Sequence, residues 1–167
     1  CPRENDNDMS KPKWWYQGWA DSEIREHASS GGAASAIIRT FIKNGGYVAS
    51  CLFNSGKFVF EVTNEMAVAR KFAGSKYVKS NPEKIYGKIQ SLLKANQKVL
   101  FIGLPCQVAA VNQFIKDKTN LVTADLICHG TPSPYLLKKC LQEYGHDINT
   151  LTDINFRIKS LYELNRD

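Results

Sequence analysis

Two apolar runs, each ending in a loop that holds one cysteine, most constrain what this chain can fold into. The runs with their loops are Lys98–Gln107 (KVLFIGLPCQ) and Thr123–Ser133 (TADLICHGTPS). Between them, Val108–Lys118 has the apolar periodicity and length of a helix. A strand, a helix and a strand of this size predict a right-handed crossover with two buried parallel strands. Because the carboxyl ends of parallel strands share one edge, where α/β folds bind ligands, Cys106 and Cys128 are expected near one site.

The rest of the chain adds helices and a hairpin around this unit. We therefore predict an α/β fold with a mixed, mainly parallel sheet flanked by helices, and with a β-hairpin addition. Ser29 or Ser30 is the expected cap of the first helix. The expected elements are a helix over Arg25–Gly46, a hairpin of Tyr47–Phe53 and Lys57–Thr63, a helix from Ser80–Pro82 to about Asn96, a helix from Ser133 to near Gly145, and a strand over Leu151–Ile158.

Length and composition exclude several classes of protein. A chain of 167 residues fits one domain with a real core. The net charge is +6, but the lysines are spread along the sequence, which favours a solvated surface over nucleic-acid binding. The apolar runs are too short to span a bilayer, and no signal peptide is recognisable, so we expect a cytoplasmic protein.

The five cysteines form no short CxxC pair, which is typical of a reducing compartment and not of a disulfide scaffold. Cys51 and Cys140 are expected to be small buried hydrophobic residues.

The start of the chain differs from the rest. Residues 1–22 are polar and then aromatic, and we interpret them as a linker before an α/β domain over residues 23–167. Because the chain begins at Cys1, we expect a fragment of a longer protein. The aromatic side chains are expected to pack on the edge of the sheet as a strand or against a missing neighbour; they are Trp14, Trp15, Tyr16 and Trp19.

Two further motifs have residue types that suit a nucleotide. Ser29-Ser30-Gly31-Gly32 at a helix entry lets a phosphate, or another stretch of backbone, approach free N–H groups. Gly74-Ser75-Lys76-Tyr77 offers backbone donors, a hydroxyl, a cation and an aromatic face. Taken alone, the first motif is also typical of a plain helix cap and the second of an ordinary turn.

Cys106 itself allows more than one chemistry. At the start of a helix its thiol pKa is lowered, so it could act as a nucleophile with His129 as the base. Two loop cysteines in one cleft also suit a metal, with His129 as a possible third ligand. Zinc and iron–sulfur sites need about four ligands, so half of such a site would be missing.

The four motifs Ser29–Gly32, Gly74–Val78, Gly103–Gln107 and Cys128–Ser133, in this order, resemble the coenzyme F420 hydrogenase/dehydrogenase beta subunit family. The likeness is to its bacterial members, often encoded near polysaccharide-synthesis genes. The motifs span most of the chain between Arg25 and Ser133.

The resemblance implies an oxidoreductase that passes electrons between FAD and a [4Fe-4S] cluster. It implies that Cys106 and Cys128 are cluster ligands and that a CxxC pair beyond Asp167 supplies the others. Lys76, Cys106 and His129 are the implied catalytic residues. The implied cofactor-binding residues are Ser29, Ser30, Gly31, Gly32, Gly74, Ser75, Lys76, Tyr77, Pro105, Gln107, His129 and Gly130.

The family resemblance also implies electron partners. Cys1-Pro2 resembles the last residues of a ferredoxin-like module, which would exchange electrons with this domain, and a small molecule would be the substrate. Two alternatives stay open. One is a cysteine-nucleophile hydrolase or transferase that uses Cys106 and His129. The other is a non-catalytic interaction domain that docks a partner through the tryptophan-rich start.

Overall fold

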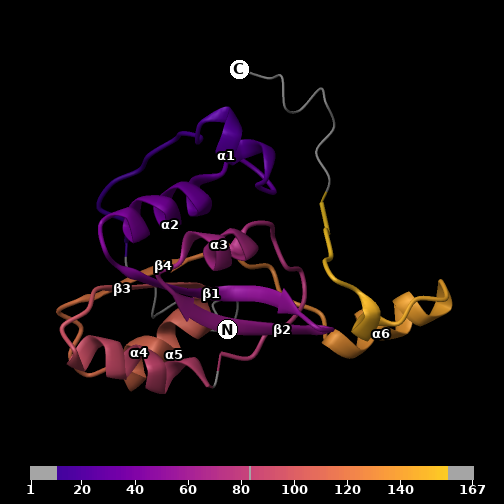
Figure 1. The fold of residues 1–167 in the computed structure, drawn as a ribbon. Helices are drawn as coiled ribbons and strands as arrows, with labels where there is room; N and C mark the ends of the chain where they lie inside the picture. Colours follow the sequence, from indigo (N-terminus) through magenta and orange to yellow (C-terminus); the bar gives the residue numbers. More distant parts are fainter. Residues whose placement is uncertain (1–10, 83, 158–167) are drawn as a thin grey trace.

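The computed structural model describes residues 11–82 and 84–157, which fold around one four-stranded sheet (Figure 1). The strand order is β2-β1-β3-β4. The strands are β1 Tyr47–Asn54, β2 Lys57–Thr63, β3 Val99–Gly103 and β4 Leu121–Asp125.

The pairing of the strands confirms the mixed, mainly parallel sheet. β1 and β2 form the antiparallel hairpin, and its turn is made by Ser55 and Gly56, both with positive φ. Two residues of this kind match the twist of the flanking strands. β1 pairs with β3 in parallel, and β3 pairs with β4 in parallel.

Helices cover both faces of the sheet. α2 and α3 lie over one face, and α4 and α5 lie over the other, so each face buries its own apolar cluster (Figure 1). β3 is buried at every position because it is a central strand covered on both sides. The helices are α1 Ser22–Glu26, α2 Ala33–Lys43, α3 Met66–Ala69, α4 Ile85–Lys94, α5 Pro105–Phe114 and α6 Pro134–Glu143, with 3₁₀ turns η2 Arg70–Phe72 and η3 Ile148–Thr150.

The predicted helix over Arg25–Gly46 is two helices. α1 ends at Glu26, a bend follows, and α2 begins only at Ala33. The cap of α2 is Gly32, with φ +79°, so the prediction that Ser29 or Ser30 caps this helix was wrong. The left-handed conformation at Gly32 separates the two helices, since L side chains rarely adopt it.

Two strand predictions also need correction. β4 is an edge strand with half-exposed Val122, not a buried one, and it ends before Ile127, which is 93% exposed. No strand forms in the described residues 151–157, and Ile158 lies outside the described residues. Leu151 and Ile154 instead pack beside Ile148 in a third apolar cluster.

Three smaller predictions differ from the structure. α4 begins at Ile85, three residues after Pro82. Cys140 is exposed on α6, whereas Cys51 on β1 is half-buried. The aromatic segment forms no strand in residues 11–20; Trp14, Trp15 and Trp19 are 76%, 87% and 65% exposed.

The helix predicted to start at Ser133 is confirmed. Ser133 caps α6, and its hydroxyl accepts a hydrogen bond from Tyr135 N over 3.2 Å. Within the described parts of the chain, no helix is both long and apolar enough to cross a lipid bilayer.

Candidate functional site

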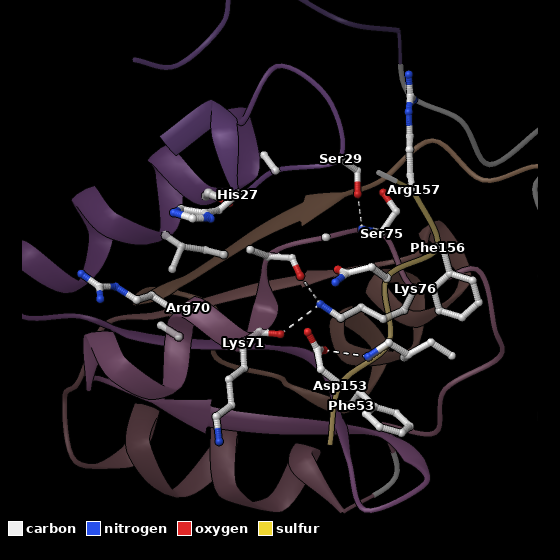
Figure 2. A pocket seen from close by; sticks show the side chains of 18 of the residues that line it. His27, Ser29, Phe53, Arg70, Lys71, Ser75, Lys76, Asp153, Phe156 and Arg157 are labelled. Carbon is white, nitrogen blue, oxygen red and sulfur yellow. Dashed lines mark hydrogen bonds between the residues drawn. The ribbon is translucent and has the colours of Figure 1, made fainter. Parts of the chain in front are cut away.

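A cavity of about 1340 Å³ lies between the first three helices and the carboxyl end of β1 (Figure 2). α1 and α2 supply one wall, and α3 with the loop after η2 supplies another. The segment 149–157 closes the cavity from the side opposite the helices, with Asp153 and Phe156 among its lining residues. Four of the residues predicted to bind a cofactor line this cavity: Ser29, Gly74, Ser75 and Lys76.

One hydrogen bond joins the two predicted nucleotide-binding loops. Ser75 N donates to Ser29 Oγ over 2.6 Å, although the two residues lie 46 positions apart in the sequence (Figure 2). Gly74 makes the turn before Ser75 with φ +79°, a conformation that favours glycine. The loops after α1 and after η2 therefore meet at the cavity wall.

The Lys76 ammonium is held inside the cavity by backbone carbonyls. Nζ donates to the carbonyl oxygens of Lys71, Phe72 and Ala73 over 3.0, 2.9 and 2.5 Å. These carbonyls end the 3₁₀ turn η2, where a cation is favourable. Burial lowers the pKa of Lys76 from 10.5 to about 8, while Cys51 and Asp153 act in the opposite direction. Lys76 therefore carries its charge at neutral pH.

The glycine pair before α2 is packed against the chain itself. Ala20 N donates to Gly31 O over 2.7 Å. A Cβ atom on Gly31 would lie 3.5 Å from Trp19 Cβ, and one on Gly32 would lie 3.1 Å from Ala20 Cβ. The close approach that these glycines permit is thus made by backbone near Ala20. Ser30, Gly31 and Gly32 do not line the cavity.

Tyr77 follows Lys76 but lies outside the cavity lining. Its ring is half-exposed and contacts the ring of Phe156 edge-on, with the centroids 5.9 Å apart. Phe156 also contacts Phe58 and does line the cavity. The sequence analysis did not identify Phe156 or Asp153 as site residues, since neither belongs to a recognisable motif.

The two cysteine loops leave the sheet at the same edge. Gly103 and Asp125 are paired in register, and each stands three residues before a cysteine. Leu126 N donates to Gly103 O over 2.9 Å, which extends the contact between the loops. The pairing of the strands confirms that both loops follow the carboxyl ends of parallel strands.

The thiols in these loops differ in surroundings. Cys106 is exposed in the first turn of α5, next to Pro105. Cys128 is half-buried, and its sulfur accepts a hydrogen bond from Gly130 N over 3.3 Å. His129 is exposed. Cys106, Cys128, Pro105, His129 and Gly130 all lie outside the cavity lining.

Gln107 is buried and bonded within the protein. Its Oε1 accepts from Leu104 N over 2.9 Å, which closes the first turn of α5. Its Nε2 donates to Ser80 O over 3.2 Å and lies 3.3 Å from Ser80 Oγ. Only 8% of Gln107 is exposed. The structure thus gives this side chain protein partners on both of its polar atoms.

The described residues contain no group of three or more histidine, cysteine, aspartate and glutamate side chains that could hold a metal ion. Cys106 and Cys128 supply two thiols at one edge of the sheet, whereas an iron–sulfur cluster takes about four. The described residues therefore do not form a complete cluster site.

Cys51 is a residue that the sequence analysis assigned only to the core. Burial raises the pKa of its thiol, and a hydrogen bond with Ser80 and the charge of Lys76 partly oppose this. Cys51 thus lies between Lys76 in the cavity and Ser80 beside Gln107. No sequence motif marks this position, because it depends on the packing of β1 against residues 76–80.

Comparisons with known proteins were made for the whole chain. A family model that describes the C terminus of the coenzyme F420 hydrogenase/dehydrogenase beta subunit matches residues 96–166. An uncharacterized protein of Methanocaldococcus jannaschii is 26% identical to this chain, over 73% of this chain and 36% of the relative.

The fold is also similar to a solved structure. A chain of the F420-reducing [NiFe] hydrogenase complex from Methanosarcina barkeri matches with a TM-score of 0.63 and 19% identity, over 83% of this chain and 53% of that chain. This chain thus spans about a third of the curated relative and about half of the hydrogenase chain.

Proposed function

We propose that this chain, which residues 96–166 place in the coenzyme F420 hydrogenase/dehydrogenase beta subunit family, is the FAD-binding part of an iron–sulfur oxidoreductase. The observation that carries the proposal is the hydrogen bond between Ser75 N and Ser29 Oγ. It joins two loops, each with residue types suited to a nucleotide, at the wall of one cavity.

The residues of the cavity fit FAD. Its volume of about 1340 Å³ exceeds the roughly 300–1,000 Å³ of typical small-molecule pockets, as a dinucleotide requires. Gly74 has open space on the side of a Cβ, since the nearest atom there is Ser29 Oγ at 4.0 Å. A ligand can therefore approach the backbone of the loop closely. Phe53 and Phe156 add aromatic surface to the lining.

Bound FAD would supply hydride and single-electron chemistry, and the protein would supply position and charge. In our proposal Ser29, Gly74 and Ser75 bind the ligand's polar groups. Lys76 presents a fixed positive charge, which favours an anionic group in the cavity. Ser30, Gly31 and Gly32 support the loop from outside, because they pack against the backbone near Ala20.

Cys106 and Cys128 are the cluster ligands in this proposal, with Pro105, His129 and Gly130 shaping their loops. Since the described residues hold two of about four ligands, the remaining thiolates have to come from elsewhere in the protein. The proposed electron partner is a ferredoxin-like protein or module, and the proposed substrate is a small molecule. The free thiols of the described cysteines support a reducing cytoplasm as the setting.

The test is a visible absorption spectrum of the full-length protein purified without oxygen, together with assays of iron and sulfide. We expect a flavin band with a broad iron–sulfur shoulder. C106S and C128S should each lose the shoulder and the iron but retain the flavin. C140S is the matched control, because Cys140 is exposed on α6 and should leave both signals unchanged.

A folded protein without flavin would overturn the proposed cavity ligand. Flavin without iron would overturn only the cluster. A folded, colourless protein that hydrolyses esters, and loses this activity in C106S, would favour the cysteine-nucleophile alternative.

A further inference from the structure

The segment Gly74–Asn81, referred to below as the linking segment, extends from the cavity to both cysteine loops. Gly74, Ser75 and Lys76 line the cavity, and Ser75 N is bonded to Ser29 Oγ. Beyond Tyr77, the segment leaves the cavity and runs past the carboxyl edge of the sheet. Its remaining residues make contacts with four other parts of the fold.

Ser80 connects the linking segment to the first cysteine loop. Gln107 Nε2 donates to Ser80 O over 3.2 Å and lies 3.3 Å from Ser80 Oγ. The other polar atom of Gln107 accepts from Leu104 N. Leu104 and Gln107 flank Pro105 and Cys106, so the contact with Ser80 fixes the side chain that closes this turn.

Lys79 connects the same segment to the second cysteine loop. Its backbone N–H donates to Pro132 O over 2.9 Å, four residues after Cys128. The segment is also anchored in the core, because Val78 is 3% exposed and Asn81 forms a parallel bridge with Val59 of β2. A segment anchored in this way transmits a displacement along its length, since packed interiors resist local deformation.

Cys51 adds a contact between the two ends of the segment. Its thiol lies beside both Lys76 and Ser80, each of which acts on its pKa. The cavity and the Cys106 loop are therefore connected by contiguous contacts through Lys76, Cys51, Ser80 and Gln107, and not only along the backbone.

We propose that the linking segment couples the cavity to both cysteine loops, with Ser80 as the residue that positions the Cys106 loop. A ligand that displaces Lys76 or Ser75 moves Ser80 and the Lys79 backbone, and the two cysteine loops respond. Because coupling between two sites is reciprocal, a change at Ser80 also alters the cavity wall. The inference goes beyond the proposed function, since it holds for any ligand of the cavity.

Hydrogen exchange of backbone amides tests the proposal on the full-length protein. In S80A we expect the Leu104 amide to exchange about five- to tenfold faster, as for the loss of one hydrogen bond. S80T retains the hydroxyl and should restore the wild-type rate. In K76M we expect faster exchange in residues 104–108 and 126–133, far along the chain from the substitution. K71M is the matched control, because the Lys71 side chain is exposed.

Each arm can overturn one part of the proposal. If the Leu104 amide exchanges at the wild-type rate in S80A, Ser80 does not position the loop. If K76M accelerates exchange only within residues 71–77, the cavity is not coupled to the cysteine loops. Should K76M fail to fold, the reverse direction decides: S80A has to accelerate exchange of the Ser75 amide, and an unchanged Ser75 rate excludes the coupling.

Discussion

Lys76 shows how the surroundings of one side chain decide what it can do. An ammonium has three N–H donors, and the three carbonyls at the end of η2 take all of them. Lys76 can therefore present charge to a ligand but cannot donate a further hydrogen bond without giving one up. This makes a long-range electrostatic role more suitable for Lys76 than direct binding of a phosphate.

The lowered pKa of Lys76 predicts a pH dependence of stability. Burial lowers the pKa from 10.5 to about 8 in the folded state. Between these pH values the unfolded chain binds more protons than the folded chain, so the contribution of Lys76 to the free energy of unfolding rises with pH. Urea denaturation at a series of pH values between 8 and 10.5, on wild type and K76M, measures this.

K76M should lack the rise that Lys76 contributes. Cys51 and Tyr86 also have raised pKa values, so only the difference between the two proteins reports on Lys76. A difference that stays constant from pH 8 to 10.5 would mean that the Lys76 pKa is not lowered by folding.

Gln107 is predicted to contribute to stability through its buried hydrogen bonds. Replacing it with leucine leaves Leu104 N and the Ser80 hydroxyl without their partner, at a cost of about 1–3 kcal/mol in the free energy of unfolding. The measurement is chemical denaturation. Q113L is the control on the same helix, where Gln113 is exposed and the cost should stay within about 0.5 kcal/mol. Equal stabilities of Q107L and Q113L would contradict this account.

At the scale of elements, the junction of α1 and α2 depends on one glycine. Gly32 has φ +79° and packs against Ala20 and Ile24, whereas Gly31 has no positive φ and ordinary contacts. Both residues come from the same Ser-Ser-Gly-Gly motif, so sequence alone treats them as equivalent. The structure separates their roles by backbone conformation.

We predict that G32A destabilises the protein by about 1–2 kcal/mol, the cost of a left-handed conformation for an L residue. The new methyl group would also lie 3.1 Å from Ala20 Cβ, which adds to the cost. G31A should stay within about 0.5 kcal/mol of wild type. Thermal unfolding followed by circular dichroism compares the two, and a G31A protein less stable than G32A would refute the assignment.

The elements that sequence predicts well are those with local signals. β3 is continuous and apolar, the hairpin has a clear turn, and α6 has Ser133 as its cap. β4 was expected to be buried because an apolar run does not distinguish a central strand from an edge strand. The predicted strand from Leu151 failed because a strand needs a neighbour to pair with, and the described part of this segment packs against an apolar cluster instead.

The candidate site was predictable in its parts but not in its assembly. The sequence identified Ser29 and Gly74–Lys76 as separate loops, and only the fold shows that they meet at one cavity. The partners of Gln107 could not be predicted, because Ser80 lies 27 residues away and belongs to no motif. Contacts between distant segments depend on packing, which a single sequence does not reveal.

At the scale of the whole molecule, the sheet separates two functional regions. The cavity lies under α1, α2 and α3, and the cysteine loops follow β3 and β4 at the carboxyl edge (Figures 1 and 2). The linking segment contacts both regions. This arrangement suits a protein in which one group is bound in the cavity and a second group is held by the cysteines, as proposed above.

The tryptophans offer a test of the surface of the whole chain. All three, Trp14, Trp15 and Trp19, lie in the exposed segment before α1 and are between 65% and 87% exposed. We expect the folded 167-residue chain to show fluorescence of water-exposed indole, with nearly the same quenching by acrylamide as the chain in denaturant. Exposed clusters of aromatic side chains mark surfaces that bind other proteins or domains. We therefore expect weaker quenching in the full-length protein, where further chain can cover the segment. Weak quenching already in the isolated chain would show that the aromatic segment packs on this domain, as the sequence first indicated, and would remove the case for a docking surface there.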